Sequence, residues 1–264
     1  MNSLRNESGS PMLNKVPEVT LSFWLIKVMA TTVGETAADF LNVNLHFGLT
    51  GTSVVMGILL AVFLFLQVRA GEYVPWLYWL VVVLISVVGT LVTDNLVDNF
   101  GVPLQTTSII FGVALLATFV VWYSFEKTLS IHSIFTSRRE LFYWAAILFT
   151  FALGTAAGDL VAEGMTLGYA KSALLFGGLI GATTVSYYLF SANAIAAFWL
   201  AYILTRPLGA SCGDLLSQPA ANGGLGLGTV VTSLLFLVSI AGLVIYLSAS
   251  RKREMAVVPI NMEE

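Results

Sequence analysis

The sequence has few of the side chains on which soft-metal and redox sites are built. It contains one cysteine, Cys212, and two histidines, His46 and His132. A single cysteine excludes an internal disulfide and nearly excludes a thiolate-rich metal site. Charged residues are also scarce, at 10% of the 264 residues, whereas soluble proteins carry about a quarter. With 57% hydrophobic residues and a mean hydropathy of +0.87, the composition indicates an integral membrane protein in contact with a lipid bilayer.

The common catalytic and nucleotide-binding motifs are absent as well. There is no nucleotide-binding loop, no HExxH helix and no GxSxG turn. The glycine-rich stretch at 223–228 follows no strand and does not predict a phosphate site. We therefore expect no enzyme activity, no tightly bound cofactor and no nucleic-acid partner, while the oligomeric state is left open.

Eight apolar segments predict an all-α integral membrane protein with eight transmembrane helices. Helices are expected because a backbone in lipid must satisfy its own hydrogen bonds. A flexible cytoplasmic tail is expected at 1–16, a single transmembrane domain at 17–250 and a second cytoplasmic tail at 251–264. The predicted spans are 20–42, 49–68, 75–97, 105–125, 141–163, 170–190, 193–216 and 226–249.

The basic residues outside the predicted spans lie almost entirely on one side of the membrane. Only Lys171 falls near a connection on the other side. By the positive-inside rule this places both termini in the cytoplasm. The residues on the predicted inner side are Arg5, Lys15, Arg69, Lys127, Arg138, Arg139, Arg251, Lys252 and Arg253.

The decisive feature is a pattern, W-x9-G-x4-D, that occurs four times. Each copy lies on an odd-numbered span, and an aromatic residue precedes each tryptophan. Because each repeat holds two helices, the repeats are parallel, at approximately 17–71, 72–136, 137–191 and 192–250. The repeated residues are Trp24, Trp79, Trp144 and Trp199; Gly34, Gly89, Gly154 and Gly209; and Asp39, Asp94, Asp159 and Asp214.

With its two membrane segments and one tryptophan per repeat, the chain resembles the bacterial membrane proteins built from four copies of the DUF347 repeat. These are described as uncharacterised membrane-anchored proteins. The resemblance covers nearly all of residues 17–250, and it implies the four-repeat architecture and a place in the bacterial cytoplasmic membrane. It implies no activity.

The three repeated residue types suggest three different roles. The tryptophans lie roughly 22 Å from their aspartates along a helix, so we interpret them as belt residues that anchor each repeat at headgroup level. The glycines are interpreted as sites of close helix packing. A carboxylate in a membrane span is costly unless it faces protein or water, so the aspartates are expected to face inward.

Seven of the chain's 15 acidic residues lie at similar depth near the outer ends of the odd spans. Three readings compete: hydrogen bonding between repeats, uptake of protons, and binding of a cation. Oxygen ligands favour hard ions such as Mg²⁺, Mn²⁺ or Ca²⁺. The predicted metal- or proton-binding residues are Asp39, Asp94, Asp159, Asp214, Glu35, Asp98 and Glu163.

Hydroxyl groups on the even spans are expected to support this cluster. The segments TSVVMG (52–57), TSIIFG (107–112) and SALLFG (172–177) resemble one another, with a weaker copy at GTVVTS (228–233). They place Ser53, Ser108 and Thr229 at a depth similar to that of the aspartates, across a short turn. Two basic residues, Lys27 and Arg206, lie within spans, and both could pair with other repeats. Alternatively, Lys27 could snorkel toward the cytoplasm.

The functional hypothesis is a membrane transporter of a cation, a hard divalent metal such as manganese or magnesium. Two alternatives remain open from the sequence. One is a proton-coupled transporter of a small solute, and the other is a membrane scaffold or sensor whose aspartates hold the repeats together.

Overall fold

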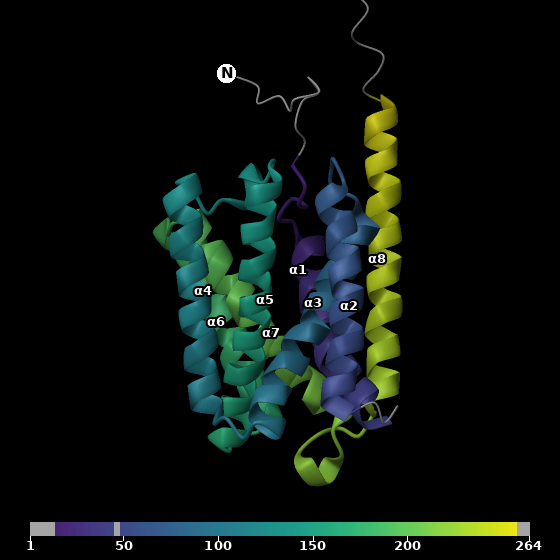
Figure 1. Ribbon diagram of the computed structural model, residues 1–264, viewed down its shortest axis with the longest axis vertical. Coiled ribbons are helices and arrows are strands. Elements are labelled where there is room, and N and C mark those ends of the chain that lie inside the picture. The colour runs from purple at the N-terminus through teal and green to yellow at the C-terminus, as the bar shows by residue number, and fades with distance from the viewer. Residues whose placement is uncertain (1–13, 45–47, 258–264) are drawn as a thin grey trace, which may run out of the picture.

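The computed structural model describes residues 14–44 and 48–257, and these residues are almost entirely helical (Figure 1). The long helices agree with the predicted segments to within a few residues, except at the end of α8. They are α1 Leu21–Asp39, α2 Gly48–Arg69, α3 Pro75–Asp94, α4 Leu104–Glu126, α5 Ser137–Asp159, α6 Tyr169–Phe190, α7 Ala194–Ser217 and α8 Thr229–Val257.

Seven of these eight helices are long and apolar enough to cross a membrane. The exception is α1, whose 19 residues include Lys27, Glu35 and Asp39. Its charged side chains are tolerated because the helix lies inside the bundle, where Lys27 is fully buried. The sequence therefore predicted the helices correctly, and seven of them are candidate membrane spans.

The odd-numbered helices form a closed inner ring. Helix α1 packs on α3 and α7, and α5 packs on the same two helices from the other side. The even-numbered helices surround this ring: α2 lies mainly against α3, α4 against α5, α6 against α7 and α8 against α1. Each repeat thus places its second helix on the first helix of the next repeat, which joins the four repeats into one unit.

The repeated glycines are the contact points of the inner ring. A Cβ atom on Gly34 would overlap Ser86 of α3, and one on Gly209 would overlap Thr31 of α1. At Gly89 the added atom would lie 2.8 Å from the Cβ atom of Phe151. Each residue met in this way lies three positions before the next repeat's glycine. The predicted packing role of the glycines is confirmed.

At Gly154 the same contact is made by Arg206, the corresponding residue of the fourth repeat. The four contacts close the ring in the order α1, α3, α5, α7 and back to α1. The helix axes can approach closely because hydrogen, rather than a side chain, occupies each crossing point.

The outer helices present apolar side chains away from the protein. On α2 these include Val54, Ile58 and Val62, which are all more than half exposed. Val113 and Leu116 form the equivalent stripe on α4. Exposed aliphatic side chains at helical spacing suit contact with lipid, whereas a soluble protein rarely exposes so large an apolar surface.

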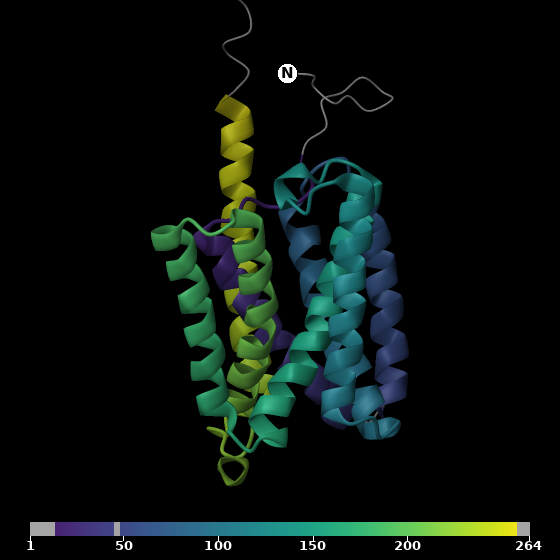
Figure 2. The same ribbon diagram turned by 90° about the vertical axis from the view of Figure 1, so that its left-hand side faces the viewer.

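The helices of the bundle run between two ends. We call the end where α1 begins and α8 finishes the termini end, and the opposite end, where α1, α3 and α5 finish, the acid end (Figure 1). Figure 2 shows α8 extending past the other helices at the termini end. It is helical to Val257, so the first seven residues of the expected second tail, 251–257, continue the helix.

Part of the expected N-terminal tail is ordered. Lys15 is buried, and its ammonium group lies 2.9 Å from Glu140 and 2.9 Å from the carbonyl oxygen of Val68. Gln67 and Trp144 also donate to Glu140, at 3.1 and 3.3 Å. A flexible tail over 1–16 is therefore wrong for its last residues, because a buried carboxylate needs the lysine as its counter-ion. Residues 1–13 lie outside the described residues.

The glycine contacts predict a sharp positional effect of alanine. Gly209→Ala should destabilise the protein by about 1–3 kcal/mol, because the methyl group must displace Thr31 from a close-packed crossing. Gly178→Ala on α6 is the matched control, since nothing lies within 4 Å of its added atom. Equilibrium unfolding in mixed detergent micelles measures both. Equal stability of the two variants would contradict glycine packing as the basis of the ring.

Candidate functional site

The repeated aspartates mark a change of backbone geometry at the acid end. Asp39, Asp94 and Asp159 are the last α-helical residues of α1, α3 and α5. Each is followed by one π-helical turn, at Phe40–Asn44, Asn95–Asn99 and Leu160–Gly164. Such turns are rare and often occur at functional sites. Asp214 differs, because α7 continues without a π-helical turn to Ser217.

Three carboxylates from different repeats converge inside the ring. Glu35 of α1, Asp159 of α5 and Asp214 of α7 each place a carboxylate oxygen within 4.8 Å of the other two. Glu35 and Asp214 are buried, and Asp159 is partly buried. Like charges this close in a protein interior repel one another strongly, so the arrangement requires protons or cations to be stable.

The other four predicted acids divide into two pairs. Asp39 and Asp94 are partly buried and interact electrostatically with Glu35 and with each other. Asp98 and Glu163 are exposed at the rim of the acid end, where Glu163 accepts a hydrogen bond of 3.0 Å from the Tyr169 hydroxyl. The structure therefore brings together part of the predicted cluster and leaves Asp98 and Glu163 at its edge.

Arg206 connects α7 to the three other inner helices. Its side chain is fully buried and donates to Glu35 at 2.8 Å, to Thr155 at 2.7 Å, to the carbonyl oxygen of Thr31 at 3.0 Å and to Thr90. The predicted pairing of Arg206 with another repeat is confirmed. The threonine partners were missed, although a signal existed, since Glu35, Thr90 and Thr155 each follow a repeated glycine.

Lys27 lies eight residues before Glu35 on α1, closer to the termini end. It is fully buried, with its ammonium nitrogen 4.0 Å from the ring centre of Phe151 and 4.1 Å from that of Tyr202. Within the described part of the chain this nitrogen has no hydrogen-bond partner. The alternative that Lys27 snorkels toward the membrane surface is wrong, because aromatic faces from two other repeats hold the side chain inside the bundle.

Aromatic side chains of the inner helices pack together at the termini end. The residues that precede the repeated tryptophans meet here: the hydroxyls of Tyr78 and Tyr143 are hydrogen-bonded, and the ring centres of Phe23 and Phe198 lie 6.1 Å apart. On α1, residues spaced by four run from the aromatic layer at the termini end to the acid end. They are Phe23, Lys27, Thr31, Glu35 and Asp39.

The tryptophans belong to this interior layer rather than to a lipid-facing belt. Trp79, Trp144 and Trp199 are at most 4% exposed, and Trp24 is partly buried. The indole N–H of Trp199 donates to the carbonyl oxygen of Leu129, at 2.9 Å. The predicted role as lipid-facing belt residues is wrong for these three, because neighbouring helices and the segment around Leu129 cover them.

The DUF347 repeat, described as a Repeat of Unknown Function, matches the chain four times, at residues 22–73, 77–128, 142–193 and 197–253. The chain belongs to the DUF347 family. No curated protein and no solved structure matches it. The four matches confirm the predicted repeats, and each covers one inner helix together with the outer helix that follows it.

Each outer helix of the DUF347 repeats has one fully buried residue with a hydroxyl group near the acid end. Ser53 lies beside these groups and accepts a hydrogen bond of 2.7 Å from Asn95, the neighbour of Asp94. The Ser108 hydroxyl is buried without a described partner, and Thr229 is only the first residue of α8. These fully buried residues of the outer helices are Thr52, Thr107, Ser172 and Thr232.

These hydroxyls correct the alignment of the fourth DUF347 repeat. Its copy of the TSVVMG segment is TSLLFL at 232–237, not GTVVTS at 228–233. Thr232 follows Asp214 by 18 residues, whereas Thr52 follows Asp39 by 13. The last connection at the acid end is therefore longer, and the weak echo at 228–233 was a shift of register.

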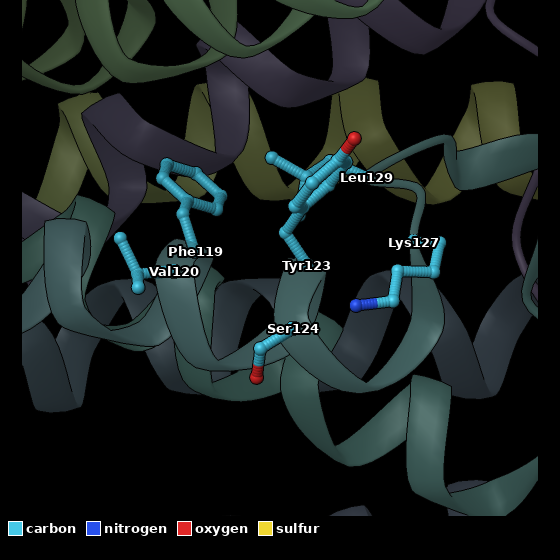
Figure 3. A pocket seen from close by; sticks show the side chains of 6 residues that line it. All are labelled: Phe119, Val120, Tyr123, Ser124, Lys127 and Leu129. Atoms are coloured by element: carbon cyan, nitrogen blue, oxygen red, sulfur yellow. The ribbon is translucent and has the colours of Figure 1, made fainter.

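A shallow groove lies apart from the carboxylates, at the termini end of α4 (Figure 3). Its lining is mainly apolar and exposed, with Lys127 and Ser124 at one side. It has no carboxylate among its lining residues. The groove is lined by Phe119, Val120, Tyr123, Ser124, Lys127 and Leu129.

The contacts of Arg206 predict the effect of neutralising its partner. Glu35→Gln should lower the free energy of unfolding by about 3 kcal/mol, because the buried guanidinium loses its ion-pair partner. This is at the lower end of the usual range, since Arg206 also interacts with Asp94 and Asp214. Asp98→Asn, at an exposed acid, is the control and should leave unfolding in detergent unchanged. A Glu35→Gln variant as stable as this control would show that the ion pair does not hold the ring together.

Proposed function

We propose that this DUF347 protein is a membrane transporter of a hard divalent cation such as Mn²⁺ or Mg²⁺. The observation that carries the proposal is the convergence of Glu35, Asp159 and Asp214, whose carboxylate oxygens lie within 4.8 Å of one another. One ion bound between them would neutralise the repulsion that burial otherwise makes costly.

The ligand chemistry supports a hard ion. Carboxylate and hydroxyl oxygens are the ligands that Mg²⁺, Mn²⁺ and Ca²⁺ prefer, whereas Cu⁺ and Zn²⁺ favour sulfur and imidazole. Cys212 is the only cysteine of the chain and is only partly buried, so it offers no thiolate cluster. Because the three carboxylates come from three repeats, a small movement of one repeat relative to another would change the ligand distances and so the affinity.

The distribution of charge supports entry from the acid end. Asp98 and Glu163 are exposed there, and both interact electrostatically with the partly buried Asp39, which also interacts with Glu35. A run of negative charge of this kind attracts cations from solution. In this proposal all eight helices cross a bacterial cytoplasmic membrane, both termini are cytoplasmic, and the acid end faces outward.

A second candidate is proton-coupled transport of a small solute. It is favoured by the titratable side chains that continue from the carboxylates toward the termini end, namely Arg206, Lys27 and the hydrogen-bonded pair Tyr78 and Tyr143. A scaffold or sensor is the third candidate, and the contacts of Arg206 with three other helices are the observation that fits it.

Uptake and binding of Mn²⁺ separate these candidates. Asp159→Asn and Asp214→Asn should weaken Mn²⁺ binding by the purified protein by on the order of 10–100-fold, and should slow Mn²⁺ flux into proteoliposomes to the same extent. Loss of a group that only orients a metal ligand already has an effect of this size. Asp98→Asn is the matched control and should retain at least half of the flux, because that carboxylate is exposed at the rim.

Three outcomes would contradict the proposed function. Folded Asp159→Asn and Asp214→Asn variants that carry Mn²⁺ and Mg²⁺ as fast as the unaltered protein would exclude the carboxylate site. Flux of a solute that depends on a proton gradient but not on any metal would favour the second candidate. Loss of folding in both variants, with no ion flux in the unaltered protein, would favour the scaffold.

A further inference from the structure

Glu35 forms an ion pair with Arg206 and also belongs to the carboxylate cluster. It cannot keep the ion pair fully when a cation is bound to the cluster. One of its carboxylate oxygens, Oε2, lies 2.8 Å from a guanidinium nitrogen of Arg206. The same carboxylate provides one corner of the cluster with Asp159 and Asp214. A divalent ion held by all three carboxylates would lie next to the guanidinium group, and two positive charges at such a distance in a protein interior repel each other strongly.

The guanidinium group also has uncharged acceptors, one on each of the three other inner helices. It donates to the carbonyl oxygen of Thr31 at 3.0 Å, to the Thr155 hydroxyl at 2.7 Å and to the Thr90 hydroxyl. Its Nε atom is buried and has no described partner. Arg206 can therefore lose Glu35 and still keep most of its hydrogen bonds, which makes the ion pair replaceable.

We propose that Arg206 is a built-in competitor for the transported cation, and that the guanidinium group and the ion bind Glu35 in alternation. This inference rests on the proposed function. In the empty protein Arg206 neutralises Glu35, so the cluster does not stand unpaired. When an ion enters, Glu35 binds the ion, and the guanidinium group keeps its hydrogen bonds to Thr31, Thr90 and Thr155.

The competition also couples ion binding to helix movement. Arg206 lies on α7 and Glu35 on α1, and their ion pair joins two helices that pack at the Gly209 crossing. An ion that breaks the pair weakens the attachment of α7 to α1, and by linkage a movement that restores the pair expels the ion. Competition between the ion and Arg206 for the Glu35 carboxylate thus provides a means of releasing the ion.

The test is equilibrium binding of Mn²⁺ to the full-length protein purified in detergent. Arg206→Gln should bind Mn²⁺ more tightly by on the order of 5–150-fold, the usual range of coupling between linked events. Thr155→Val should bind it more weakly, because the guanidinium group released from Glu35 would keep fewer acceptors. Arg138→Gln removes an exposed positive charge at the termini end and should change nothing.

The opposite signs distinguish competition from a simple effect of charge. If Arg206→Gln tightens binding while Thr155→Val leaves it unchanged, Arg206 acts only by long-range repulsion and the inference is overturned. It is also overturned if Arg206→Gln binds no better than the unaltered protein. If the unaltered protein itself binds no Mn²⁺, the proposed function fails, and the inference that rests on it fails with it.

A second pair of variants keeps the test decisive if Arg206→Gln does not fold. Thr155→Ser retains the hydroxyl group that accepts from Arg206, and Thr155→Val removes it at nearly the same volume. Competition predicts normal binding by the serine variant and weaker binding by the valine variant. Equal affinities for Mn²⁺ in these two folded proteins would overturn it.

Discussion

The close approach of the four inner helices at their repeated glycines is the constraint on which the rest of the structure depends. At Gly34, Gly154 and Gly209 an added Cβ atom would overlap a side chain of the next repeat. Only this spacing lets Arg206 of α7 reach acceptors on α1, α3 and α5 at once. The same spacing brings the carboxylates of separate repeats within a few ångströms, where their charges must be neutralised.

The four repeats share one arrangement of inner and outer helices, but their side chains inside the ring differ. The residue after each repeated glycine is Glu35, Thr90 or Thr155 in the first three repeats and alanine in the fourth. Three positions before the glycine, only the fourth repeat carries a charge, at Arg206. The ring and the aspartates thus come from positions that repeat, whereas the ion pair at its centre comes from positions that differ between repeats.

Sequence periodicity was sufficient for the helices, their parallel repetition and the packing role of the glycines, because each of these depends on spacing along the chain. It predicted that Arg206 could pair with another repeat but not that the partner is Glu35, because spacing along one helix does not say which residue of another helix lies beside it. The tryptophans were misplaced for a similar reason: burial of Trp199 depends on the distant segment around Leu129. Binding of an ion by the carboxylates stays a prediction.

The most direct test is anomalous X-ray scattering from crystals of the protein grown with Mn²⁺. The account predicts one strong peak between the carboxylates of Glu35, Asp159 and Asp214, with metal–oxygen distances of about 2.0–2.6 Å. It further predicts that Arg206 has separated from Glu35 in that state. A peak confined to the exposed acids Asp98 and Glu163, with the ion pair intact and the interior carboxylates empty, would contradict it.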